Sequence, residues 1–316
     1  MAVVSHAPDC ATDGFRHEAV LYHGIGDLLA TVVPFVREGL DQGEPVLVAM
    51  PKDRVRSLAD ALGADAARVQ FVDMVELGAN PACIIPEWRR FLDRGAGRPV
   101  RGIGEPVWAG RRDVEIDECA LHESLLNVAF DEGPAWRLLC PYDVDRLPAR
   151  ALEEAQRTHP VVGSDGERGM DYQGHGHALS AFAGTLTAPP PTADTVPFAG
   201  HDLAGVRDLV RQLSRQAGVP ADAAEDLVLA AHELATNSIT HGGGSGVICA
   251  WREAGAFVVE VRDSGTIVNP LVGRELSSLS SENGRGVWMA NQLCDLVQVR
   301  STVTGTVVRL FAWVKA

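Results

Sequence analysis

Two side chains in the second half of the chain could bind a metal ion or move a proton. Glu233 and Asn237 belong to a segment, His232-Glu-Leu-Ala-Thr-Asn-Ser-Ile-Thr-His241, that has helical patterning. Residues four apart share one face of a helix. A carboxylate and an amide oxygen placed in this way can hold Mg²⁺, directly or through water, or activate a hydroxyl group. The spacing alone is equally typical of a solvated polar face.

Two glycine-containing motifs further along the chain could bind other parts of a nucleotide. Asp263-Ser-Gly265 ends an apolar run that predicts a strand. Its carboxylate could accept a hydrogen bond from an exocyclic amine, while the glycine would let the backbone approach a flat ring. Gly284-Arg-Gly286 precedes an apolar helical segment, where free backbone amides could meet phosphate oxygens. Taken singly, the first motif also fits a turn, and the second fits a glycine-rich helix cap.

The elements that must position these motifs follow an α+β pattern. Two helical segments come first, and then two adjacent strands, a long polar loop, a helix and a final hairpin. Their ranges are 202–216, 221–240, 246–251, 257–262, 286–295, 296–301 and 306–313. Helices on one face of a largely antiparallel sheet make an α+β sandwich.

Taken together, the motifs resemble a known nucleotide-binding superfamily. Their order, closed by Gly305-Thr306 on the last strand, resembles the N box and the three glycine boxes of the GHKL ATPases. Within that superfamily, the compact form with a short lid is similar to the anti-sigma regulatory serine/threonine kinases. The resemblance covers residues 197–316 and implies the Bergerat α+β sandwich, with ATP and Mg²⁺ as cofactors.

The resemblance also implies roles for residues on the base side of the nucleotide. Asp263 would accept a hydrogen bond from the adenine amino group, Gly265 would give the ring clearance, and Thr306 would lie at the base pocket. The first glycine box departs from the family pattern, because no second glycine occurs between Gly265 and Pro270. This departure predicts a stiffer lid hinge and leaves nucleotide affinity and turnover open.

On the phosphate side, the resemblance implies four further roles. Asn237 would hold Mg²⁺, and Gly284 and Gly286 would lie near the phosphates. Glu233 would be the general base for a protein hydroxyl.

The first half of the chain alternates strands and helices. Apolar runs predict strands at 19–22, 45–50, 69–72, 100–103 and 136–140, and helical patterns fall between and after them at 27–41, 52–62, 84–93, 115–130 and 149–158. This alternation is typical of a parallel, doubly wound α/β sheet.

Three segments of this half resemble the MEDS-type sensory domain, a RecA-like unit without a working phosphate loop. They begin at Phe15, Gly104 and Cys140 and read FRHEAVLY, GEPVW and CPYD. The resemblance covers about residues 14–180.

We expect a sensory crevice in this first domain. His17, Glu105 and Asp143 fall at predicted strand ends, where open α/β sheets bind ligands. Trp108 would form a wall of the crevice. The alternative is that these residues are structural ends of strands. Cys140 is expected in the core, and no metal ligand is assigned apart from Asn237.

Composition limits the class of protein and its partners. The 316 residues include 28 Lys+Arg and 42 Asp+Glu, a net charge of −14, which disfavours binding to nucleic acid or an anionic membrane. The two lysines, Lys52 and Lys315, do not follow glycine, so a Walker phosphate loop is absent. The six scattered cysteines predict reduced thiols. With no apolar run of about 18 residues and no signal peptide, we expect a cytoplasmic protein.

A proline-rich stretch sets the domain boundaries. The segment GTLTAPPPTADTVP predicts an extended spacer, and the polar residues 164–177 before it predict a loop. We therefore expect a sensory domain at 1–183, a linker at 184–196 and an ATPase/kinase domain at 197–316.

These features together predict an anti-sigma regulator whose sensor controls transcription through an ATP-dependent serine/threonine kinase. Its expected partners are a sigma factor and an anti-sigma-factor antagonist, and a homodimer is compatible with this assignment. One alternative is a non-catalytic ATP-binding module that sequesters a partner. Another is a histidine-kinase-like sensor, which is disfavoured because the linker leaves no room for a phospho-accepting helical hairpin.

Overall fold

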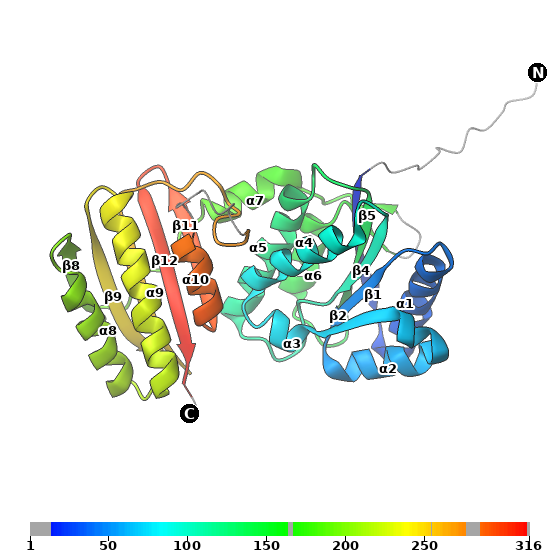
Figure 1. The fold of residues 1–316 in the computed structure, drawn as a ribbon, viewed down its shortest axis with the longest axis horizontal. Helices are drawn as coiled ribbons and strands as arrows, with labels where there is room; N and C mark the ends of the chain where they lie inside the picture. The colour runs from blue at the N-terminus through cyan, green and yellow to red at the C-terminus, as the bar shows by residue number, and fades with distance from the viewer. Residues whose placement is uncertain (1–13, 164–166, 254, 276–284, 315–316) are drawn as a thin grey trace, which may run out of the picture.

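The chain forms two sheets, each with its own covering helices (Figure 1). A computed structural model describes residues 14–163, 167–253, 255–275 and 285–314. Gly284, expected near the phosphates, lies outside the described residues.

The first domain is a doubly wound α/β unit, as predicted. Its seven-stranded sheet has the order β3-β2-β4-β5-β1-β6-β7, parallel except for the antiparallel pair β6 and β7. The strands are β1 (Phe15–Tyr22), β2 (Val46–Met50), β3 (Val69–Asp73), β4 (Val100–Gly104), β5 (Trp136–Asp143), β6 (Val161–Val162) and β7 (Glu167–Arg168). The helices are α1 (Gly24–Asp41), α2 (Lys52–Leu62), α3 (Met74–Leu77), α4 (Ile84–Gly95), α5 (Asp113–Ala129), α6 (Ala149–Thr158) and α7 (Gly174–Phe182), with the 3₁₀ turns η1 (Gly63–Arg68) and η2 (Pro81–Cys83).

Helices cover both faces of this sheet because its central strands are apolar on both sides. In β2, Val46 and Val48 belong to the core cluster under α1 and α2, whereas Leu47 and Ala49 belong to the cluster with α4, α5 and α6. Alternate residues of a strand point to opposite faces. The expectation of a loop over 164–177 is wrong at its end, since α7 begins at Gly174 and buries Ala178 and Phe182.

The second domain is the predicted α+β sandwich. Its antiparallel sheet has the order β11-β12-β10-β9-β8, and α8, α9 and α10 pack on one face. The strands are β8 (Asp194–Ala199), β9 (Ser245–Glu253), β10 (Ala256–Asp263), β11 (Leu296–Thr302) and β12 (Gly305–Trp313). The helices are α8 (Leu203–Gln216), α9 (Ala221–Thr240) and α10 (Arg285–Leu293).

The proline-rich connection is partly ordered against the second sheet. Strand β8 starts at Asp194, inside the range expected for the linker, and pairs with β9. Before it, the carbonyl oxygen of Thr187 accepts a hydrogen bond from the Arg309 guanidinium on β12. In the part of the chain that the structure describes, no helix is both long and apolar enough to cross a membrane.

Candidate functional site

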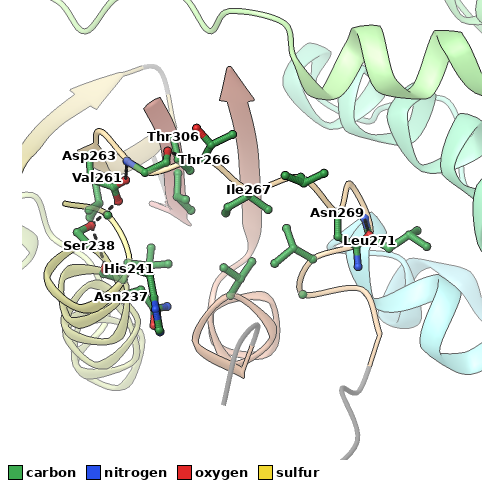
Figure 2. A pocket seen from close by; sticks show the side chains of 18 of the residues that line it. Asn237, Ser238, His241, Val261, Asp263, Thr266, Ile267, Asn269, Leu271 and Thr306 are labelled. Carbon is green, nitrogen blue, oxygen red and sulfur yellow. Dashed lines mark hydrogen bonds between the residues drawn. The ribbon is translucent and has the colours of Figure 1, made fainter. Parts of the chain in front are cut away.

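A cleft of about 630 Å³ opens beside the end of α9 in the second domain. Its walls come from α9, β10, β12 and the segment that follows β10 (Figure 2). The volume lies in the range of small-molecule sites. Asn237, Asp263, Gly265 and Thr306, four of the residues predicted for nucleotide binding, line it.

Asp263 is fixed in the cleft by two hydrogen bonds that engage both of its carboxylate oxygens. The Ser238 hydroxyl donates to Oδ2 at 2.6 Å, and the Gly265 amide donates to Oδ1 at 2.8 Å. The carboxylate is therefore tied to α9 on one side and to the turn after β10 on the other. A carboxylate oxygen has lone pairs for more than one donor, so Asp263 can still accept a hydrogen bond from a ligand amine.

Glycines leave the room that this arrangement needs. A Cβ at Gly265 would lie 2.7 Å from the Gly242 Cα and 2.9 Å from the His241 carbonyl oxygen. A Cβ at Gly242 would lie 2.4 Å from the Asp263 Cγ. The end of α9 and the turn after β10 can therefore approach each other only because both positions are glycine.

Thr306 connects the cleft to the last strands. Its Oγ1 donates to the Gly265 carbonyl at 2.8 Å and lies 2.9 Å from the Ser301 hydroxyl. Ser301 Oγ in turn accepts the Ile267 amide at 2.8 Å. This chain of hydrogen bonds fixes the start of the segment that leaves β10.

Asn237 lies where the predicted phosphate end of the cleft meets α10. A Cβ at Gly286 would lie 2.4 Å from the Asn237 Nδ2 and 3.6 Å from its Oδ1, so the helix start touches the amide. An amide oxygen is a suitable ligand for Mg²⁺, and helix N-termini favour phosphate. Glu233 lies one turn earlier on α9 and is half-buried; it is not among the described residues that line the cleft.

The segment after β10 leaves the cleft and reaches the first domain. We call residues 266–275 the lid segment. Leu271 is buried in the core cluster that includes α4 and α5, and Glu275 forms an ion pair with Arg89 of α4. Arg274, also buried, has its guanidinium 3.6 Å from the Glu118 carboxylate of α5.

Glu118 is the centre of this contact between domains. Its side chain is buried, and it accepts hydrogen bonds from Gln298 and Arg300 of β11 in addition to facing Arg274. Nearby, the Asn80 side chain donates to the Asn291 carbonyl of α10 at 3.1 Å. One wall of the cleft is thereby held by the first domain.

In the first domain, two of the four residues predicted for a sensory crevice come together. Glu105 follows β4 and Asp143 ends the adjacent strand β5. The Arg54 guanidinium lies between them, 3.0 Å from Glu105 Oε1 and 2.9 Å from Asp143 Oδ2. Tyr22 donates its hydroxyl to Glu105 at 3.0 Å. Burial raises the pKa of Glu105 to about 8, although Arg54 opposes the shift. These groups occupy the carboxyl edge of the sheet.

The other two predicted residues lie elsewhere. His17 is in the middle of β1, fully buried, with its ring between Asn127 and Glu123 of α5. Trp108 stacks on Arg111, whose Cζ lies 3.7 Å from the ring centroid. His17 precedes Tyr22, the last residue of β1, by five residues. It therefore lies away from the carboxyl edge of the sheet, inside the domain core.

Two further cleft residues, Ser238 and Gly242, could not be singled out from the sequence, whereas His241 follows Asn237 by four residues on the same predicted helix face. Ser238, His241 and Gly242 line the cleft from the end of α9. Ser238 is adjacent to Asn237, but the sequence does not show that the hydroxyl of a helical serine will donate a hydrogen bond to a distant carboxylate. That partner, Asp263, becomes visible only when β10 is packed against α9.

Two family models match parts of the chain. Residues 16–160 match the family model described as MEthanogen/methylotroph, DcmR Sensory domain (MEDS), and residues 196–312 match the Histidine kinase-like ATPase domain. A crystal structure of the RsbU and RsbW domains of a Mycobacterium tuberculosis protein is similar at 18% identity and a TM-score of 0.29, over 38% of this chain and 32% of that chain. The similarity thus spans about a third of the chain in that structure. No curated protein matches the chain.

Proposed function

From a chain that joins a MEDS domain to a histidine kinase-like ATPase domain, we propose an ATP-dependent serine/threonine protein kinase controlled by its sensor. Its substrate would be a Ser or Thr of an anti-sigma-factor antagonist, and its second partner would be a sigma factor. The observation that carries the proposal is the fixed Asp263 carboxylate in a cleft that also contains Asn237 and adjoins the start of α10.

The cleft suits an adenine nucleotide in a defined orientation. Asp263 would accept the exocyclic amine of the base, and Gly265 leaves space for the ring. From there the cleft extends to Asn237, so the phosphates would lie toward α10. The amides at the start of that helix favour negative charge.

Phosphoryl transfer depends mainly on positioning and charge neutralisation. Mg²⁺, held by the Asn237 amide oxygen, would supply charge neutralisation at the phosphates. Glu233 lies on the same helix one turn away, half-buried, where an incoming protein hydroxyl would meet its carboxylate. Its role would be to accept the hydroxyl proton.

The contact between the domains supports control by the sensor. In GHKL-type sites a lid covers the nucleotide, and here the lid segment is held by Glu118, Arg89 and the core around Leu271. A change in the first domain that moves α4 and α5 would move these anchors. The sensor would thus act on nucleotide binding through the lid segment.

The sigma factor and the antagonist are proposed as partners because the sequence motifs resemble the compact, short-lid form of the GHKL domain in anti-sigma regulatory serine/threonine kinases. A histidine-kinase-like arrangement is less suitable, because the described residues between α7 and β8 contain no helical hairpin. A non-catalytic module that grips a partner when ATP binds is the remaining alternative, and it shares the same cleft.

Two variants distinguish a kinase from a binding module. Glu233→Gln keeps the shape of the side chain but cannot accept a proton, so transfer of labelled γ-phosphate to an antagonist should fall about 10²–10⁴-fold. Mg·ATP binding should survive. Asn237→Ala should weaken both, because the metal ligand is lost. Unchanged transfer by Glu233→Gln, or no transfer by the parent protein to any antagonist, would favour the binding module.

A further inference from the structure

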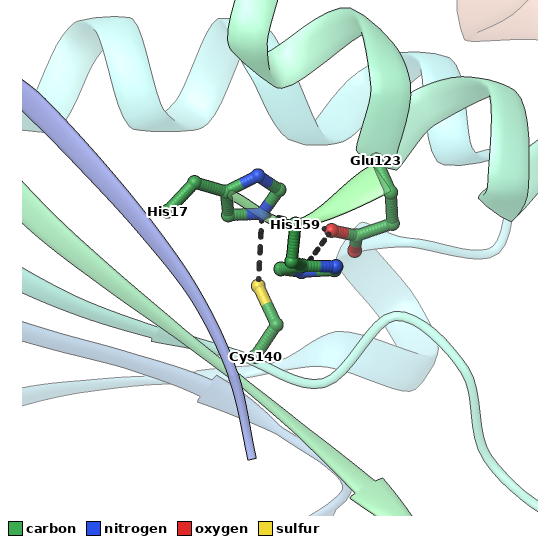
Figure 3. A group of neighbouring side chains, drawn as sticks. All are labelled: His17, Glu123, Cys140 and His159. Atoms are coloured by element: carbon green, nitrogen blue, oxygen red, sulfur yellow. Dashed lines mark hydrogen bonds and ion pairs between the residues drawn. The ribbon is translucent and has the colours of Figure 1, made fainter. Parts of the chain in front are cut away.

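A buried cluster in the first domain places four metal-ligating side chains around one point (Figure 3). His17 comes from β1, Glu123 from α5, Cys140 from β5 and His159 from the residue that follows α6. The ligand atoms all lie within 4.8 Å of one another, and all four residues are buried. The nucleotide cleft does not use any of them.

The hydrogen bonds of His159 direct a lone pair into the cluster. Its Nδ1 lies 2.8 Å from the Ala155 carbonyl oxygen, so the ring proton is on Nδ1. Nε2 is then an acceptor, yet it faces the Glu123 carboxylate at 3.1 Å and has no hydrogen-bond donor among the described residues. Two acceptors in contact are unfavourable unless a cation lies between them.

His17 also directs a lone pair into the cluster, although the Cys140 thiol lies within hydrogen-bond distance of it. Its Nδ1 lies 3.1 Å from the Asn127 Oδ1, and the Asn127 amide nitrogen donates to the Thr158 carbonyl at 2.7 Å, which fixes the orientation of the amide. The His17 proton is therefore also on Nδ1. Its Nε2 faces Glu123 Oε2 at 3.0 Å and the Cys140 sulfur at 3.4 Å.

We propose that His17, Glu123, Cys140 and His159 bind one divalent transition-metal ion, with zinc the best match. Glu123 Oε2 faces two acceptor nitrogens, the Nε2 atoms of His17 and His159. A second proton on one imidazole would relieve only one of these contacts, whereas one metal ion would relieve both and also bind the sulfur. The Glu123 Oε1 has no hydrogen-bond partner among the described residues, so the carboxylate has further capacity to bind a cation.

The geometry and the donor set both suit zinc. Zinc–ligand distances near 2.0–2.3 Å place the donors of a tetrahedral site roughly 3.2–3.8 Å apart. The contacts of 3.0, 3.1 and 3.4 Å are close to that spacing. A thiolate and a carboxylate with two neutral imidazoles would balance the charge of the ion, as a buried site requires.

Both histidines are also held by a hydrogen bond on the ring nitrogen that faces away from the cluster. A metal-bound histidine commonly donates a hydrogen bond from its other ring nitrogen to a carbonyl or amide oxygen. Here the acceptors are the Ala155 carbonyl for His159 and the Asn127 side-chain amide for His17. Four buried protein ligands are typical of a structural or sensing centre, which has no open position for catalysis. The ion would join β1, β5, α5 and the end of α6.

Metal analysis of the full-length protein, free of any affinity tag, tests the proposal. Elemental mass spectrometry should find about one equivalent of zinc or another divalent transition metal per chain. Cys140→Ser and His159→Gln should each lower the metal content per chain by tenfold or more. Cys119→Ser is the matched control, because Cys119 is a buried cysteine of the same domain whose thiol contacts the Pro106 carbonyl instead, and it should keep the metal.

Protein produced in cobalt-supplemented medium gives a second readout that does not need the variants to fold. A thiolate charge-transfer band and strong visible bands of tetrahedral Co²⁺ are expected from the wild type, with X-ray absorption showing one sulfur and three nitrogen or oxygen ligands. A wild-type protein without stoichiometric metal and without these bands would overturn the proposal. So would full metal retention in folded Cys140→Ser and His159→Gln.

Discussion

At the scale of single residues, close approach between two backbone segments shapes the proposed nucleotide site. Gly265→Ala would place a methyl group within 3 Å of both Gly242 and the His241 carbonyl, so the turn that holds Asp263 must shift. We expect ATP affinity to fall roughly tenfold or more, equivalent to about 1.4 kcal/mol. Calorimetry would compare it with Gly205→Ala, a change on α8 where the added carbon meets open space. Equal affinities for the two variants would contradict the close approach.

Glu105 gives a residue-scale prediction in the sensory domain. Its pKa is raised by burial from 4.5 to about 8, so between these values the folded state keeps a proton that the unfolded chain has lost. Stability should therefore fall as pH rises through this window. Relative to Glu105→Gln, which cannot titrate, the wild-type unfolding free energy should drop by roughly 1–3 kcal/mol between pH 5 and pH 8. Urea denaturation measures it, and parallel pH curves for the two proteins would contradict it.

At the scale of elements, the contact of α5 with the lid segment and β11 should restrain the nucleotide site. Glu118→Gln leaves Arg274 and Arg300 without their buried counter-charge, which should loosen the lid segment from the sensor. We expect ATP affinity to rise roughly fivefold or more. Asp117→Asn is the matched control, because Asp117 is exposed and pairs with Arg150 in its own domain. The same affinity in both variants, or a decrease with Glu118→Gln, would contradict the restraint.

The order of most elements was predictable from the sequence, although α3, α7 and the strands β6, β7 and β8 were missed. The contacts between elements were not predictable. Periodicity and capping locate α9, and four-residue spacing places Glu233 and Asn237 on it. Nothing local relates Glu118 to Arg274 or His17 to His159, because each pair meets only after the sheets are assembled. The buried cluster was missed for this reason: its four ligands come from four separate segments. His17 was expected at a strand end, whereas β1 begins at Phe15 and continues to Tyr22.

At the scale of the whole molecule, the boundary between the domains can be tested by dissection. Strand β8 begins at Asp194 and forms the edge of the second sheet, so a fragment of residues 193–316 should fold and bind ATP. It should bind at least as tightly as the full chain, because the lid segment is no longer held by α5. A fragment of residues 200–316, which lacks β8, should be less stable. A 193–316 fragment that is insoluble or does not bind nucleotide would mean that the two halves share one core.

The most direct test of the account is base selectivity. We propose that Asp263 accepts a hydrogen bond from the adenine amine. Guanine has a carbonyl at that position, and this second acceptor would face the carboxylate. ATP should therefore bind roughly 10–100-fold more tightly than GTP. Asp263→Asn should remove most of this preference, whereas Asp222→Asn, an exposed change in the first turn of α9, should keep it. Calorimetric titration of the three proteins with both nucleotides decides the matter. Equal binding of ATP and GTP by the wild type, or an unchanged preference in Asp263→Asn, would contradict the assignment of the cleft.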